Sequence, residues 1–166
     1  LLEAPDGERM EAVFMEYSYG NSICVSTQIG CNMGCVFCAS GIGGKIRNLK
    51  AWEMLDEFVM IRKFTGKPIN HIVLMGMGEP FDNYEEVKSF INLLHDKDGI
   101  NLSLRNITVS TCGVIPGIEA FGKDFPQANL AVSLHRSNQK GRENLMPIAK
   151  KYKLPELIKA CKSDYV

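Results

Sequence analysis

Short apolar segments alternate with helical segments along most of the chain, and this alternation constrains the fold more than any other feature. Four segments rich in β-branched or apolar residues are predicted strands: residues 23–26, 71–75, 106–110 and 129–134. Four segments with apolar residues at helical spacing are predicted helices: residues 52–64, 84–95, 116–121 and 154–162. Strand followed by helix, repeated, implies parallel strands joined by crossovers. We expect an α/β fold that is either doubly wound or part of a β/α barrel.

Polar and glycine-rich residues follow each predicted strand. A cysteine-containing loop follows the first strand, residues 76–80 the second, 111–113 the third and 135–137 the fourth. Both kinds of α/β fold place their chemistry at the C-terminal ends of parallel strands. We therefore expect the functional residues to gather at that edge of the sheet.

The composition is that of an ordinary globular protein. The chain has 166 residues, of which 45% are hydrophobic and 23% charged, so one domain is the default. No apolar run approaches the roughly 18 residues that span a bilayer, and the N-terminus lacks the pattern of a signal peptide. We expect a cytoplasmic protein that does not contact a membrane. The chain ends on a helical pattern with no further strand, and we expect it to be cut from something longer.

The charges balance, with 19 Lys and Arg against 19 Asp and Glu. Bulk electrostatics therefore do not indicate a nucleic-acid-binding protein, which usually carries a basic field. Residues 136–166 are richer in Lys and Arg than in acids. This local excess indicates either solvated helix faces or a surface that faces phosphate groups.

Three of the six cysteines lie close together, at Cys31, Cys35 and Cys38, in a loop that also contains Gly30 and Gly34. Glycine permits the positive φ angles that turn the side chains of such a loop toward one centre. Structural zinc usually takes four protein ligands in two pairs, and the sequence contains no second pair. Three thiolates on a four-iron cluster leave one iron open to a substrate. We favour the cluster over zinc or a turn without metal.

The order Cys-x-x-x-Cys-x-aromatic-Cys after a first strand resembles the radical S-adenosylmethionine (SAM) superfamily. The resemblance implies a 4Fe-4S cluster whose open iron is chelated by the amino and carboxylate groups of SAM. It also implies that an electron from the cluster splits the sulfonium bond and releases a 5′-deoxyadenosyl radical. The fold implied is a radical SAM core, a partial β/α (TIM-like) barrel with parallel strands, here truncated.

A wider set of motifs resembles one family of that superfamily. The blocks are residues 19–31, 71–80, 110–113, and 133–135 followed by 145–147. Together they are similar to the RlmN/Cfr family, which methylates adenine in the large-subunit ribosomal RNA and, for RlmN-type members, in some tRNAs. The resemblance covers essentially the whole chain.

The resemblance assigns roles to individual residues. Cys31, Cys35 and Cys38 would bind the cluster. SAM would contact Gly78, Glu79, Ser110, Ser133, Leu134 and His135, and the catalytic residues would be Glu11 and Cys24. A carboxylate at a strand end can accept a hydrogen bond from the methionine ammonium, and a glycine permits close backbone approach. The chemistry of Glu79 and Gly78 therefore supports the roles that the resemblance assigns to them. Considered alone, Cys24 could be a small buried residue, His135 a core histidine and Glu11 a surface acid.

In the family, Cys24 would resolve a covalent protein–RNA intermediate by a disulfide with a second, methyl-carrying cysteine, and Glu11 would accept a proton. We predict that Cys24 faces the cavity with a proton acceptor near it. The second cysteine lies near the family's C-terminus. Cys161 is the only later candidate, and we expect it to pack within a helix. We divide the chain into a lead-in segment, residues 1–20, and an incomplete core, residues 21–166, that binds the cluster but cannot complete methyl transfer.

The function implied is methylation of C2 of an adenine in 23S rRNA, and of tRNA in RlmN-type members, by a methyl-cysteine and radical mechanism. An electron donor such as flavodoxin or ferredoxin would serve it, and we expect a monomer. Three rivals remain: a C8-specific rRNA adenine methyltransferase of the same family, a radical SAM activating enzyme, and a non-enzymatic thiolate zinc module that binds RNA.

Overall fold

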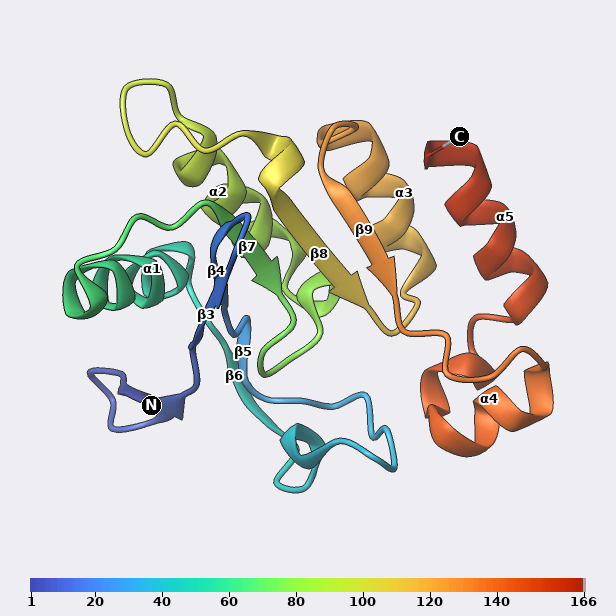
Figure 1. The fold of residues 1–166 in the computed structure, drawn as a ribbon. Helices are drawn as coiled ribbons and strands as arrows, with labels where there is room; N and C mark the ends of the chain where they lie inside the picture. Colours follow the sequence, from blue (N-terminus) through green and yellow to red (C-terminus); the bar gives the residue numbers. More distant parts are fainter. Residues whose placement is uncertain (166) are drawn as a thin grey trace.

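The protein is built around one five-stranded sheet with the strand order β3-β4-β7-β8-β9 (Figure 1). The computed structural model describes residues 1–165, with side chains up to Lys162. The strands are β3 (Val13–Tyr17), β4 (Gly20–Cys24), β7 (His71–Leu74), β8 (Ile107–Thr111) and β9 (Asn129–Val132). The last four run parallel, and β3 pairs antiparallel with β4. The expected α/β fold with parallel strands is confirmed, and all four predicted strands are present.

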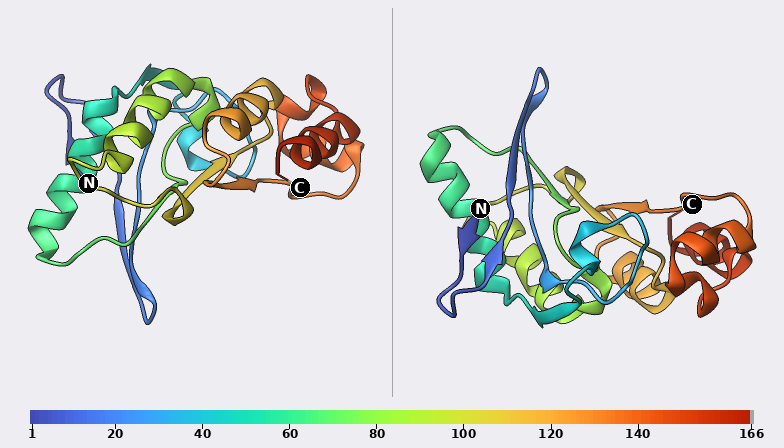
Figure 2. Two further views of the ribbon diagram at one scale, coloured as in Figure 1. Left: turned by 90° about the horizontal axis from the view of Figure 1, so that it is seen from above. Right: turned by 90° about the horizontal axis from the view of Figure 1, so that it is seen from below.

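One face of the sheet is covered by helices α1 (Ala51–Thr65), α2 (Tyr84–His95) and α3 (Ile115–Asp124) (Figures 1 and 2). Helix α5 (Leu154–Tyr165) packs against α3. The opposite face carries no helix in the described part of the chain, and the β3–β4 hairpin projects beyond it (Figure 2). An open sheet with helices on one face is the arrangement of part of a β/α barrel, in which the uncovered face would be the inner one.

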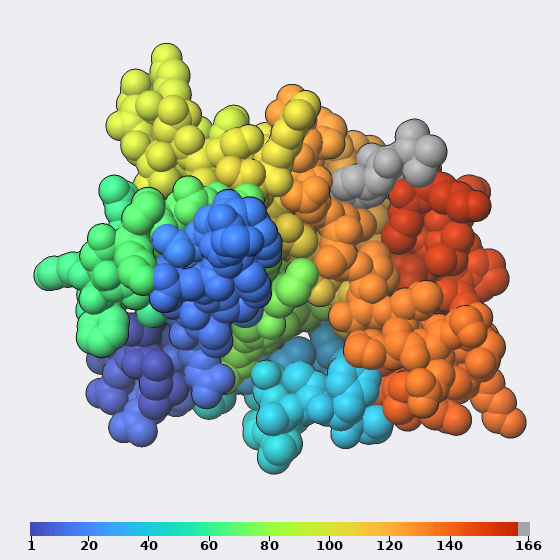
Figure 3. Space-filling view, in the orientation of Figure 1, coloured from blue at the N-terminus to red at the C-terminus, as the bar shows by residue number. Residues whose placement is uncertain are grey.

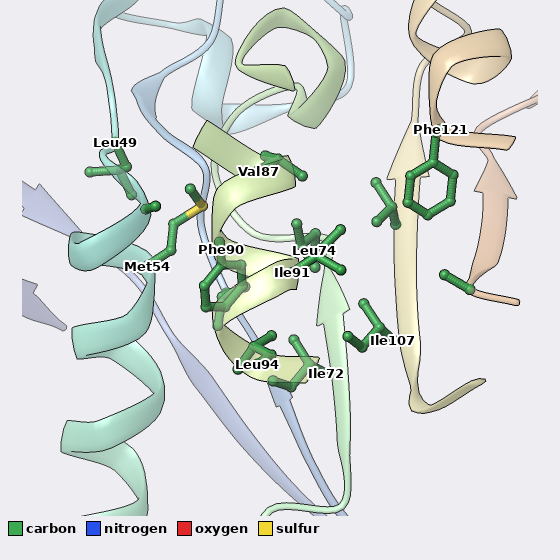
Figure 4. Close-up of a cluster of buried hydrophobic side chains, with 14 of the residues drawn as sticks. Leu49, Met54, Ile72, Leu74, Val87, Phe90, Ile91, Leu94, Ile107 and Phe121 are labelled. Atoms are coloured by element: carbon green, nitrogen blue, oxygen red, sulfur yellow. The ribbon is translucent and has the colours of Figure 1, made fainter. Parts of the chain in front are cut away.

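The core lies between the sheet and these helices (Figure 4). Burial alternates along β7 and β8, so that Ile72, Leu74 and Ile107 point toward the helices and are almost fully buried. Phe90 and Ile91 of α2 pack against them. Each such side chain contributes about 1.5–3 kcal/mol relative to exposure. The alternate positions, such as Thr108 and Ser110 of β8, face the open side, which leaves polar strand residues free to line a site.

Several short elements were not predicted from the sequence. They are β1 (Leu2–Glu3), β2 (Arg9–Met10), β5 (Gln28–Gly30), β6 (Lys45–Asn48), η1 (Ala39–Gly41), η2 (Pro80–Asp82), η3 (Leu104–Asn106), α4 (Gln139–Leu145) and η4 (Pro147–Lys150). The antiparallel pair β5–β6 brackets the segment that contains the three clustered cysteines. Strands of two to four residues carry too few positions to show a periodic pattern.

Helix α4 begins after Asn138, whose side chain accepts a hydrogen bond from the Gly141 N–H at 2.8 Å. Asparagine is a favoured N-cap residue, so a start signal was present in the sequence. None of the helices within residues 1–165 is both long enough and apolar enough to cross a bilayer.

Candidate active site at the strand ends

A pocket of about 270 Å³ lies between the cysteine loop and the C-terminal ends of β7, β8 and β9. The hollow is visible in Figure 3 between the cyan cysteine loop and the orange segment around α4. Eight of the residues assigned from the sequence line it: Cys31, Cys35, Cys38, Gly78, Glu79, Ser110, Ser133 and His135. The parallel sheet brings these residues together because its strands all end at the same edge.

The backbone of the cysteine loop is fixed at both ends by the β5–β6 pair. The Cys31 N–H donates to the Gly44 carbonyl at 3.2 Å. Gly30 has a φ of 74°, and a Cβ there would lie 1.9 Å from the same Gly44 carbonyl oxygen. Gly34 has a φ of 65°. The two glycines therefore adopt the positive φ angles that the sequence predicted for them.

The three thiols share one pocket without converging on a single point. Among the side chains that the structure describes, residues 1–162, no group of three or more His, Cys, Asp or Glu is close enough to hold one metal ion. Burial raises the pKa of Cys31 and of Cys35. Three soft sulfur ligands spread around a pocket fit a polynuclear cluster better than a tetrahedral zinc ion.

The turn after β7 packs very closely against the segment that follows β4. Gly76 has no room for a side chain, because a Cβ would lie 2.7 Å from the Val25 carbonyl oxygen. At Gly78 the φ is 108°, and a Cβ would lie 2.7 Å from the Gln28 Cβ. The Met77 carbonyl accepts from Thr27 N–H at 2.8 Å. Protein packing alone thus requires glycine at positions 76 and 78, and the same glycines leave backbone open toward the pocket.

Glu79 is buried at the edge of the pocket and bridges two strand ends. Its Oε2 accepts from the Cys112 N–H at 2.8 Å and its Oε1 from the Phe81 N–H at 3.1 Å. A carboxylate has about four acceptor sites, so each oxygen keeps capacity for a further donor. Its position is fixed by the backbone, and the group is suited to receive a cation such as an ammonium.

His135 lies just beyond β9 in an unusual backbone conformation. Its φ is 56°, and the Arg136 N–H donates to the Leu134 carbonyl at 2.7 Å, which closes a tight turn. The imidazole packs against the Phe37 ring of the cysteine loop, with centroids 4.3 Å apart. A strained residue at a strand end is typical of a functional site. Leu134 itself is exposed and does not line the pocket.

The two assigned catalytic residues lie outside this pocket. Cys24 lines a separate hollow of about 370 Å³ on the open face between β3, β4 and β7, and Met75 lines both hollows. Burial, opposed by a hydrogen bond to the Met75 backbone, raises the pKa of Cys24. Glu11 is exposed, and its carbonyl accepts from the Ser26 hydroxyl at 2.8 Å.

Sequence reasoning missed three buried residues, one of which lines the pocket. Cys112 was given no role from the sequence, but it lines the pocket. Burial and, to a smaller extent, the Glu79 carboxylate raise its pKa. Arg142 was counted in a basic surface segment, but it is fully buried. Glu57 of α1 is also buried, and it accepts from the Ser26 N–H at 3.0 Å. Only Cys112 had a usable signal, since it follows a predicted strand.

Comparison with known proteins identifies the family. Residues 25–163 match the sequence model of the radical SAM superfamily. The chain belongs to this superfamily. Radical SAM proteins use an iron–sulfur cluster and SAM, and the three pocket thiols with Glu79 fit that pair of cofactors.

Individual relatives are more specific. The chain is 54% identical over 162 residues to a protein of Thermoanaerobacter sp. (strain X514) named "Probable dual-specificity RNA methyltransferase RlmN", covering 98% of this chain and 46% of the relative. A protein of the same name from Caldicellulosiruptor saccharolyticus is 51% identical, covering 96% and 46%. The expected resemblance to RlmN proteins is confirmed. The chain spans about half the length of these curated relatives.

A solved structure gives the same result for the fold. The crystal structure of a radical SAM methyltransferase from Sphaerobacter thermophilus superposes with a TM-score of 0.92 at 42% identity, covering 97% of this chain and 48% of the other. The radical SAM core predicted from the sequence is therefore confirmed over nearly all of the chain.

Proposed function

We propose that this radical SAM chain is the catalytic core of an RNA methyltransferase that methylates C2 of an adenine in 23S rRNA and in tRNA. The observation that carries the proposal is the single pocket in which three cysteine thiols face a buried strand-end carboxylate. The names of the relatives, each a dual-specificity RNA methyltransferase, support RNA as the substrate.

The residues of the pocket divide into two sets with different tasks. Cys31, Cys35 and Cys38 would hold a 4Fe-4S cluster. When bound, the cluster and SAM supply one-electron cleavage of a sulfonium bond, which generates a carbon radical. Glu79 would accept a hydrogen bond from the methionine ammonium of SAM, and Gly78 would let the backbone approach it. Ser110, Ser133, Leu134 and His135 complete the proposed SAM contacts from the ends of β8 and β9.

Cys24 and Glu11 would act on the RNA rather than on the cofactor. Cys24 lies on the open face, beside the pocket and linked to it through Met75. Its raised pKa keeps the thiol protonated until a base or the substrate approaches. Glu11 would accept the proton released from the adenine adduct. Cys161 packs on α5 against the core, which supports a packing role for it rather than that of the methyl-carrying cysteine.

The proposal also covers the electron donor, the cellular location and the oligomeric state. The reaction needs single electrons from a donor such as flavodoxin or ferredoxin, and we place the protein in the cytoplasm as a monomer. We further propose that residues 1–166 bind the cluster and SAM but do not complete methyl transfer.

The direct test uses two preparations and product analysis by mass spectrometry. The chain reconstituted without oxygen, given SAM and dithionite, should release 5′-deoxyadenosine, and Cys35→Ala should abolish that release. The protein extended to the length of its relatives should form 2-methyladenosine in 23S rRNA, and Cys24→Ala should prevent release of the product. Formation of 8-methyladenosine would contradict C2 specificity. Methyladenosine from residues 1–166 alone would show that no second cysteine is needed.

A further inference from the structure

Arg142 of α4 is the only cationic side chain that is fully buried within the described part of the chain. Its Nη2 donates to the carbonyl oxygen of Cys112 and, at 3.4 Å, to that of Ser133. The guanidinium therefore holds together the ends of β8 and β9, beside the pocket that both residues line.

The remaining donors of this guanidinium are unused. Nε and Nη1 of Arg142 are buried without a hydrogen-bond partner, and no carboxylate pairs with Arg142 among the side chains described, residues 1–162. Arginine cannot lose its proton in a protein, and a buried unpaired charge costs several kcal/mol. We therefore expect the guanidinium to face an anion when the pocket is occupied.

The cysteine loop would bring negative charge close to this guanidinium once its thiolates hold a cluster. The Val36 N–H donates to the Leu145 carbonyl at 3.0 Å, and a Cβ at Gly34 would lie 3.6 Å from Pro147. The segment around α4 thus packs directly on the loop that carries Cys35. Burial lowers the pKa of Arg142, and the sulfurs of Cys112 and Cys35 act in the opposite direction. The guanidinium is therefore within electrostatic reach of a predicted cluster ligand.

We infer that Arg142 is a positioning residue that provides the countercharge for the thiolate-ligated cluster and raises its reduction potential. Three thiolates outweigh the positive charge of the oxidised cluster core, and one added electron makes the site more negative still. A buried positive charge stabilises the reduced form more than the oxidised form. The inference rests on the proposed function, because it requires the cluster to be present.

The other anion that could use these donors is the carboxylate of bound SAM. The two sources can be separated, because the cluster can be titrated before SAM is added. If Arg142 serves the cluster, its removal changes the potential in the absence of SAM. If it serves SAM, its removal changes only the affinity for SAM.

The experiment is an EPR-monitored redox titration of the anaerobically reconstituted chain, with dithionite as the one-electron source and no SAM. Arg142→Gln should lower the ratio of reduced to oxidised cluster at a fixed potential by about tenfold, equal to about 59 mV for a one-electron couple. Arg142→Lys keeps the charge and should stay close to the unmodified chain. Arg105→Gln is the matched control, since Arg105 is exposed in η3, just before β8 begins, and should have no effect.

Two results would overturn the inference. One is an unchanged potential in Arg142→Gln with full iron content, whether or not SAM affinity falls. The other is a fall of about tenfold in the ratio of reduced to oxidised cluster in Arg142→Lys, because that variant keeps the positive charge. The Lys variant decides the question if Arg142→Gln takes up no iron. If the unmodified chain itself binds no cluster, the proposed function fails rather than the role of Arg142.

Discussion

Glu57 is a carboxyl group that α1 carries into the core, where burial raises its pKa to about 9. In the unfolded chain the pKa is near 4.5, so between these values folding takes up a proton. The contribution of Glu57 to the free energy of unfolding should therefore be largest below about pH 4.5 and fall by up to about 1.4 kcal/mol per pH unit as pH rises toward 9.

Glu57→Gln removes this titration while keeping an oxygen for the Ser26 N–H. We expect the variant to be more stable than the unmodified chain at pH 8, with a flatter pH dependence, in urea unfolding at several pH values. Asp56→Asn, one residue away and exposed, is the control and should keep the slope. A slope that persists in Glu57→Gln would assign it to another group.

Gly76 tests whether the turn after β7 depends on close backbone packing. Gly76→Ala places a Cβ 2.7 Å from the Val25 carbonyl oxygen, and we expect a loss of about 1–3 kcal/mol in the free energy of unfolding. At Gly43 a Cβ meets nothing within 4 Å, so Gly43→Ala should change stability by less than about 0.5 kcal/mol. Urea unfolding measures both, and equal effects would show that the contact is relieved without cost.

At the residue scale, the sequence indicated residues in motifs at strand ends. It did not indicate charged residues that the fold buries. The spacing of the cysteines pointed to their loop, and the family resemblance pointed to Gly78, Glu79 and Ser110; all of these residues line one pocket. Arg142 and Glu57 could not be found, because a single Arg or Glu in a helical pattern normally lies on the surface. Their burial depends on contacts with residues distant in the sequence.

At the scale of elements, Asn83 joins three segments. It lies at the N-terminus of α2, and its Nδ2 donates to the carbonyls of Thr27, at 2.9 Å, and Leu49, at 2.8 Å. Asn83→Ala leaves two buried carbonyls without this donor, and we expect a loss of about 2–3 kcal/mol in the free energy of unfolding. The exposed Asn92 on the same helix is the control, and Asn92→Ala should change little. Equal losses at both positions would show that helix propensity, not the buried amide, is responsible.

The main elements were predictable because strand and helix patterns alternate over several residues each. The β3–β4 hairpin was not, since β3 shows no regular alternation of buried and exposed positions and follows a polar lead-in. The β5–β6 pair is shorter still and is held by contacts such as the Leu49 N–H to the Thr27 carbonyl at 3.1 Å. Local sequence carries no signal for pairing of that kind.

At the scale of the whole molecule, helices cover one face of the open sheet and the other face carries none among the described residues (Figures 1 and 2). Eight of the proposed cofactor ligands line one pocket at the strand ends. The central claim is that three cysteines bind a cluster with one open iron, next to the carboxylate that receives SAM. All proposed steps depend on that open position.

Mössbauer spectroscopy of the chain reconstituted with ⁵⁷Fe tests this claim most directly. The account predicts about four irons per chain in a three-to-one pattern, with only the unique iron changing when SAM is added. Cys161→Ala should leave the spectrum unchanged, and Cys38→Ala should remove it. Zinc in place of iron, or four equivalent irons that do not respond to SAM, would contradict the account.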